Sequence, residues 1–148
     1  MFRGSSNHTI DEKGRFIIPT RFRDVIRAKG EETLMISKMD GCLVAYPMDE
    51  WSKIEERLLA TVDKSAKMRR FRRIFIGAAF KCQVDRQGRV LIPPVLREYG
   101  ALDKEISLVG VLDHFEIWSK EKLDLEEMHH EEDLKEEDFS NEIAKLGL

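Results

Sequence analysis

Hydrophobic and polar positions alternate along this chain in an order that occurs twice. "TIDEKGRFII" places β-branched and aromatic residues on both sides of a short polar segment, which predicts a strand, a tight turn and a second strand. A short helix ending near Gly30 follows, and "TLMIS" and "CLVAY" then predict two further strands. Trp51, Ile54 and Leu58 recur after them at helical spacing. Each half of the chain therefore reads as strand, turn, strand, helix, two strands and helix.

The repetition extends to the residues themselves. "DEKGRFIIPTRFR", Asp11 to Arg23, returns seventy-four positions later as "DRQGRVLIPPVLR", Asp85 to Arg97. Six of the thirteen aligned positions are identical: Asp11/Asp85, Gly14/Gly88, Arg15/Arg89, Ile18/Ile92, Pro19/Pro93 and Arg23/Arg97. With a one-residue gap the match continues from 33–51 onto 105–123. An internal repeat of this size predicts a duplicated architecture.

In each copy a glycine permits the tight turn and a proline ends the strand that follows it. Gly14 and Gly88 can adopt a positive φ without a Cβ clash, as a hairpin loop of three or four residues requires. Pro19 and Pro93 offer no ladder donor, so we expect them to end the strands and to suit the first turn of the helix that follows.

A basic helix is predicted between the halves. "KSAKMRRFRRIFIGAAF" has Met68, Phe71 and Phe75 at helical spacing with arginines between them, and a strand resumes after Gly77. This segment could bind nucleic acid. We favour a structural or subunit-interface role, in which it meets acidic residues of a neighbouring copy such as those in 121–142.

The carboxy-terminal end is acidic. Ser119 is placed as the N-cap of a charged helix, and a thin apolar stripe at Phe139, Ile143 and Leu146 predicts either a peripheral helix or a partly disordered tail. We expect four parts: a first repeat over 1–63, a basic connecting helix over 64–77, a second repeat over 78–122 and an acidic tail over 123–148.

Charge is divided unevenly along the chain. From Lys120 onward there are eleven acidic and four basic residues, a net charge of −7, which leaves +4 on the other 119 residues because the whole chain is at −3. A mildly basic body with an acidic end remains compatible with nucleic acid as a partner.

Several classes of protein are disfavoured. No apolar run approaches the ~20 residues that span a bilayer, and the amino terminus does not resemble a signal peptide, so we expect a cytoplasmic protein. Cys42 and Cys82 lie in strand-like stretches and are expected to be buried free thiols. No phosphate-binding loop or nucleophile motif occurs. We therefore expect no cofactor, no small-molecule substrate and no catalysis. His129 and His130 lack further ligands at a recognised spacing, so we also expect no metal site.

The repeated Asp-x-x-x-Arg allows two interpretations. Asp11 can accept hydrogen bonds from turn amides while Arg15 neutralises it, and Asp85 and Arg89 repeat the arrangement. Such a surface ion pair contributes only ~0–1 kcal/mol. Alternatively, the aspartate is a scaffold and the guanidinium projects from the sheet toward phosphate or the O6/N7 edge of guanine.

Family resemblance favours the second interpretation. "TIDEKGRFIIPTRFR" resembles the DNA-binding module of AbrB-type bacterial regulators. Two copies, together with "MFRG", "YPMDEW", "FIGAAFKCQVDRQGRVLIPPVLREY" and "EIWS", resemble the MraZ family from Met1 to about Lys122. The resemblance implies an α+β fold with a mainly β core and flanking helices, a duplicated AbrB-like swapped-hairpin barrel that forms an intramolecular pseudo-dimer.

The resemblance also implies a function. Members are transcriptional regulators that generally repress their own division and cell-wall operon, assemble into rings and bind direct repeats in double-stranded DNA, which would associate this chain with the nucleoid. Arg15 and Arg89 would carry DNA binding, with Asp11, Gly14, Asp85 and Gly88 as the motif scaffold. Further candidates, for phosphate contacts, are Arg3, Lys13, Arg86 and Arg23.

Two alternatives remain. Antitoxins share the AbrB-like fold and use an acidic or amphipathic extension to sequester a toxin, although they normally carry one motif copy per chain. A general nucleoid-binding protein with little sequence preference is the other alternative.

Overall fold

The computed structural model describes all 148 residues and contains eight strands and six helices. The first copy forms β1 (Ser5–Thr9), β2 (Arg15–Ile17), α1 (Thr20–Ala28), β3 (Thr33–Met39), β4 (Cys42–Pro47) and α2 (Met48–Ala60). After α3 (Ala66–Gly77), the second copy forms β5 (Phe80–Gln83), β6 (Arg89–Leu91), α4 (Pro94–Gly100), β7 (Glu105–Gly110), β8 (Phe115–Ser119) and α5 (Lys120–Asp133). A last helix, α6 (Glu137–Ala144), follows. The predicted order of elements is confirmed.

The two copies exchange strands. The main antiparallel sheet has the order β1-β7-β8-β4-β3-β5, and β2 pairs with β6 in a separate two-stranded ribbon. The first strand of each copy therefore extends the sheet of the other copy, and the second strands of the copies pair together. The α+β, swapped-hairpin, duplicated fold is confirmed. The simple hairpin expected for each turn is corrected, because β1 and β2 leave the turn toward different partners.

One hydrophobic core joins both copies. Side chains alternate across the sheet, so Ile36, Leu43, Ile106 and Ile117 fall on one face, where α1 and α4 cover them. Phe22 of α1, which is 1 % exposed, is among the side chains that cover this face. Because this core draws on both copies, neither copy has a core of its own.

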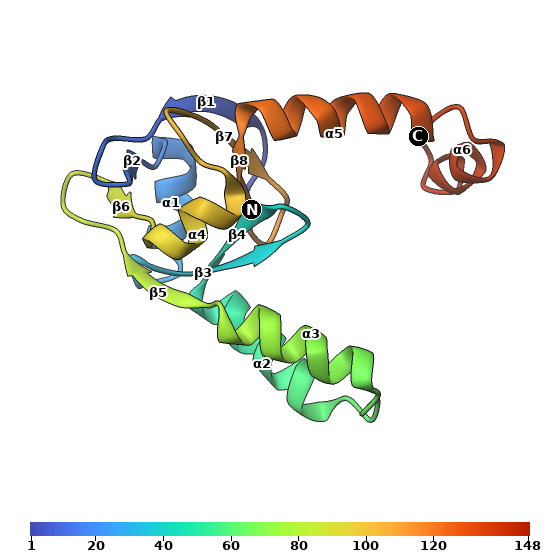
Figure 1. Ribbon diagram of the computed structural model, residues 1–148, viewed down its shortest axis with the longest axis horizontal. Helices are drawn as coiled ribbons and strands as arrows, with labels where there is room; N and C mark the ends of the chain where they lie inside the picture. The colour runs from blue at the N-terminus through green and yellow to red at the C-terminus, as the bar shows by residue number, and fades with distance from the viewer.

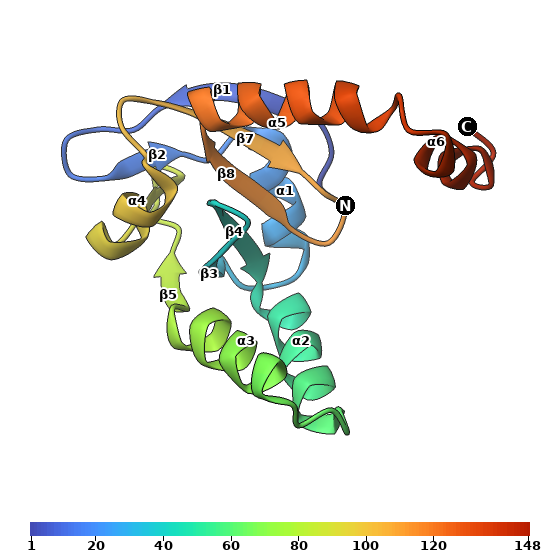
Figure 2. The same cartoon turned by 45° about the vertical axis from the view of Figure 1, so that its right-hand side comes forward.

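A second, smaller cluster lies on the other face of the sheet. Val44 and Trp118 meet Trp51 of α2 and Phe75 of α3 there. The rings of Trp51 and Phe75 contact each other with their centroids 5.3 Å apart and their planes tilted by 30°. The two helices form a hairpin that extends away from the sheet (Figures 1 and 2). The predicted basic helix therefore packs on the core through Phe75 and leaves its arginines outside.

The tail is helical and extends from the body of the molecule, residues 1–119. Ser119 Oγ accepts a hydrogen bond from the Lys122 amide at 3.1 Å, which confirms the predicted N-cap of α5. α5 leads away from the sheet, and α6 lies at its far end in both views (Figures 1 and 2). Of the two possibilities for the tail, the structure shows the peripheral helix.

Two remaining expectations concern cysteines and membranes. Cys42 and Cys82 are both free and buried, as predicted, and burial raises the pKa of Cys82 to about 11. None of the helices is sufficiently long and apolar to span a membrane.

Candidate nucleic-acid interface

The two Asp-x-x-x-Arg turns have the same geometry. Asp11 Oδ1 accepts hydrogen bonds from the amides of Lys13 (3.0 Å) and Arg15 (2.8 Å), and its Oδ2 accepts from Arg15 Nε at 2.9 Å. Asp85 repeats these contacts with Gln87 and Arg89, each at 2.9 Å. Each aspartate thus stabilises its turn and also orients its arginine, as the structural interpretation of the pair predicted.

The aspartates remain ionised and the arginines remain partly free. The pKa of Asp11 is lowered chiefly by the hydrogen bond from the Arg15 amide, and that of Asp85 by the corresponding bond from Arg89. The side chains of Arg15 and Arg89 are 30 % and 31 % exposed. Because only Nε is used within the chain, the two terminal Nη groups of each guanidinium are left to bind another molecule.

Both arginines lie on one face of the β2–β6 ribbon. Arg15 is opposite Leu91 and Ile17 is opposite Arg89, whereas Phe16 and Val90 between them point into the core. These four exposed or half-exposed side chains form what we call the outer face of the ribbon: Arg15, Ile17, Arg89 and Leu91. The turns at its two ends project from the same side of the molecule (Figure 1).

Ile17 and Leu91 were not identified from the sequence as site residues. They are 59 % and 51 % exposed although each lies in an apolar strand. The signal that could have found them is alternation, because strands that bury Phe16 and Val90 must turn the neighbouring side chains outward.

Each turn is also held by the other copy. Ile18 donates to the Gly88 carbonyl and Ile92 donates to the Gly14 carbonyl, both at 2.8 Å. The side chain of Arg97 lies over Gly14, where an added Cβ would come within 2.5 Å of its Nε. These contacts fix the position of each turn relative to the opposite copy.

Arg23 holds the second turn in a similar way. Its Nη2 donates to the carbonyls of Asp85 (3.2 Å) and Arg86 (3.4 Å), and its Nε donates to Glu32 at 3.1 Å. The side chain is only 16 % exposed. The structure therefore places Arg23 as a clamp on the turn, with most of its donors engaged within the chain.

The other phosphate candidates are divided. Lys13 and Arg86 are exposed within the turns, beside the motif arginines. Arg3 precedes β1, whereas the first turn follows it, so about eight residues of mostly extended chain separate them, on the order of 25 Å. The structure does not bring Arg3 to the ribbon.

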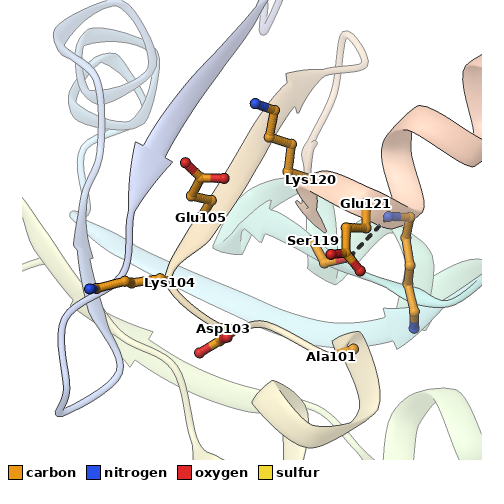
Figure 3. Close-up of a pocket in the computed structure, with 8 residues that line it drawn as sticks. Ala101, Asp103, Lys104, Glu105, Ser119, Lys120 and Glu121 are labelled. Carbon is orange, nitrogen blue, oxygen red and sulfur yellow. Dashed lines mark hydrogen bonds between the residues drawn. The ribbon is translucent and has the colours of Figure 1, made fainter.

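A cavity lies away from the ribbon. It has a volume of about 530 Å³ and lies between the start of β7 and the first turn of α5, where Glu105, Lys104 and Lys120 line it (Figure 3). Ala101 is the one hydrophobic side chain of its lining, whereas ligand pockets are mostly apolar with a few convergent polar groups. His129 and His130 lie on exposed α5, and no group of three or more His, Cys, Asp or Glu side chains is placed to hold a metal ion.

Comparison with known proteins agrees with this geometry. The chain matches the family model described as "MraZ protein, putative antitoxin-like" twice, over residues 1–74 and 75–144. It is 55 % identical to the transcriptional regulator MraZ of Desulfosudis oleivorans and 54 % identical to that of Desulforapulum autotrophicum, over the full length of each pair. The MraZ protein of Shewanella violacea is 41 % identical, again over all of both chains.

These relatives are named for gene regulation, which confirms the expectation of a non-enzymatic protein. Two matches that cover nearly the whole chain, and full-length relatives at this identity, show that the chain belongs to the MraZ family.

Proposed function

We propose that this chain is a transcriptional regulator that binds double-stranded DNA sequence-specifically through the outer face of the β2–β6 ribbon. One observation carries the proposal: Arg15 and Arg89 lie on one two-stranded ribbon with their Nη groups free. The names of the relatives support the same function.

The ribbon has the dimensions and donors that base readout needs. The major groove of B-DNA, about 12 Å wide, admits a two-stranded ribbon, and arginine donates two parallel hydrogen bonds to guanine O6 and N7. Asp11 and Asp85 hold Nε, so the guanidinium planes are oriented before DNA arrives and less side-chain entropy is lost on binding. Ile17 and Leu91 add apolar surface beside them, which suits the methyl group of thymine.

Lys13 and Arg86 supply phosphate contacts in this proposal. Both are exposed in the turns that flank the ribbon, so they would meet the backbone while the ribbon reads bases. Arg23 acts indirectly, through its hold on the second turn.

Assembly compensates for the small size of one ribbon. A single outer face makes few contacts, but linked copies multiply weak affinity through effective concentration. Copies that bind direct repeats spaced by about one helical turn, ~10–10.5 bp, lie on the same side of the duplex. We therefore propose a ring-shaped oligomer that binds promoter repeats at the nucleoid and represses its own division and cell-wall operon, as the family resemblance implies.

Mutation of the arginines tests the proposal. Arg15→Ala and Arg89→Ala should each lose about 1–3 kcal/mol of binding to promoter repeats, roughly five- to 150-fold, with a smaller loss on scrambled duplex. Arg15→Lys should also lose selectivity, since lysine lacks both the planar donor fork and the Nε that Asp11 orients. Fluorescence anisotropy with labelled duplexes measures both.

Arg57→Ala is the matched control. Arg57 lies on α2, bonded only to the Lys53 carbonyl, so its loss removes the same charge away from the ribbon and should leave binding unchanged. Wild-type affinity in both motif variants, or equal losses in Arg57→Ala, would contradict the proposal.

The antitoxin alternative keeps one supporting observation, the exposed acidic α5 and α6. It is distinguished by a small toxin that co-purifies with the chain and leaves when the tail is removed. Competition with excess unrelated DNA separates a promoter-specific regulator from a general nucleoid-binding protein.

A further inference from the structure

An apolar groove beside α3 has no partner within the chain. Two adjoining hollows of about 330 and 320 Å³ share Lys38 and Ile74. Their apolar lining includes Met39, Phe71, Ile74, Phe80 and Val95, and we call the combined surface the α3 groove. Phe71, Ile74, Phe80 and Val95 are 38 %, 50 %, 41 % and 58 % exposed, so a continuous apolar patch faces solvent.

Unpaired positive charge surrounds the α3 groove. α3 carries five basic residues and no acidic one. None of its basic side chains forms a salt bridge in the chain, and Arg69 reaches only the Lys64 carbonyl. Arg73 and Lys38 line the groove itself, together with one carboxylate, Asp40, so its lining is net basic. An apolar floor with a basic rim suits an amphipathic segment that carries acidic residues.

α6 is a segment of that kind. Phe139 and Ile143 are half-buried and lie one turn apart on the helix, and Leu146, just beyond its end, is 73 % exposed. Glu137, Asp138 and Glu142 lie on the same helix, and Glu136 is its N-cap. α6 is thus acidic and apolar where the α3 groove is basic and apolar.

α6 lies away from the α3 groove of its own chain, so a partner for it must come from another molecule. α5 is 14 residues long, about 21 Å, and carries α6 away from the body, whereas the α2–α3 hairpin extends in another direction (Figures 1 and 2). The α6 of one copy therefore does not cover the groove of the same copy.

We infer that α6 of one copy binds the α3 groove of a second copy, with the apolar stripe on the groove floor and the carboxylates against Arg73 and its neighbours. The contact joins two different surfaces, so it is head-to-tail and generates a closed ring when the rotation between copies permits closure. This inference rests on the proposed oligomeric regulator and names the surfaces that would build it.

Nucleic acid is the other partner that an arginine-rich helix could bind. The turns of the ribbon project to the left in Figure 1, whereas α3 extends below the sheet, so the two surfaces face different directions. Exposed Phe71 and Ile74 between the arginines also suit a protein partner better than a phosphate backbone.

Two complementary variants test the inference by light-scattering mass. Ile74→Asp places a charge in the groove, and Ile143→Asp places one on the α6 stripe; each should convert the oligomer to a single chain of 17.3 kDa. Mixed in equal amounts, one variant supplies an intact α6 and the other an intact groove. The mixture should therefore stop at two chains, about 35 kDa, twice the single-chain mass. Leu125→Asp, at a 53 % exposed site on α5, is the matched control and should keep the wild-type mass.

Other outcomes overturn the inference. These are a monomeric wild type, either single variant at wild-type mass, a mixture that stays monomeric, or one that restores the full oligomer. Loss of DNA affinity in Arg73→Glu at unchanged mass would make α3 a nucleic-acid surface instead. An oligomer insensitive to these variants that still needs Arg15 and Arg89 for DNA would overturn the docking but leave the proposed function intact.

Discussion

At the scale of single residues, the aspartate of each motif determines what its arginine can do. The Asp11 carboxylate binds Nε of Arg15 and the amide of the same residue, so the guanidinium has one orientation and two free ends. The lowered pKa of Asp11 means that this stabilisation is present above the ordinary value of 3.8 and is lost as pH falls through the lower folded value. The arrangement therefore persists at neutral pH.

Gly14 provides a prediction at this scale. Gly14 and Gly30 have nearly equal φ values, 90° and 91°, but a Cβ at Gly14 would meet Arg97 whereas one at Gly30 would meet nothing within 4 Å. Gly30→Ala should cost only the left-handed strain, about 1–2 kcal/mol. Gly14→Ala should cost more, because Arg97 must also move. Urea unfolding of both variants measures the difference.

Arg97→Ala is the control for this comparison. In its background the extra cost of Gly14→Ala should disappear, since the obstructing side chain is gone. Equal losses for Gly14→Ala and Gly30→Ala in the wild-type background would contradict the clamp between the copies.

At the scale of elements, strand exchange decides what can fold. β1 pairs with β7, and β5 pairs with β3, so a single copy lacks the partner of its own first strand. We expect residues 1–63 alone to show no cooperative unfolding at micromolar concentration, and addition of 64–148 to restore it. Circular dichroism during urea titration measures both. A cooperatively unfolding monomeric 1–63 fragment would contradict the shared core.

Much of this level could be predicted from the sequence. The repeat and its apolar periodicity predicted the strands and the helices up to α4, and Ser119 predicted the start of α5, whereas the apolar stripe at Phe139, Ile143 and Leu146 left open whether α6 forms. Local pattern could not predict which strands pair, because a turn such as 11–15 permits a hairpin and an exchange alike. It also could not show that Arg23 reaches the opposite turn, a contact between residues 62 positions apart. The two prolines were expected in the first turn of the helices, but Pro19 and Pro93 lie one position earlier, at the N-cap.

At the scale of the whole molecule, the surfaces proposed for DNA binding and for assembly face different directions. The ribbon turns project to the left in Figure 1, the α2–α3 hairpin extends downward and the tail extends to the right. The acidic tail, with a net charge of −7 from Lys120 onward, is thereby kept away from the surface proposed for DNA. The net charge of the whole chain, −3, does not reveal this separation of an acidic tail from a basic body.

Salt dependence tests the division between phosphate and base contacts. Lys13→Ala should weaken binding to promoter and scrambled duplex alike, and should lower the slope of log affinity against log salt by about 1. Arg15→Ala should act mainly on the promoter duplex. Anisotropy titrations over a range of salt concentrations measure both slopes. A Lys13→Ala variant with an unchanged slope would remove that lysine from the phosphate contacts.

Fusion of the copies has one more consequence, which concerns polarity. A symmetric dimer must present two identical turns and is matched to a palindrome. Here the turns have diverged, with Glu12 and Lys13 in one and Arg86 and Gln87 in the other. The two ends of the proposed binding surface therefore differ, and the DNA site that it binds can be non-palindromic. Successive copies can then bind the duplex in the same orientation. Direct repeats require this orientation, because each repeat has the same direction along the DNA.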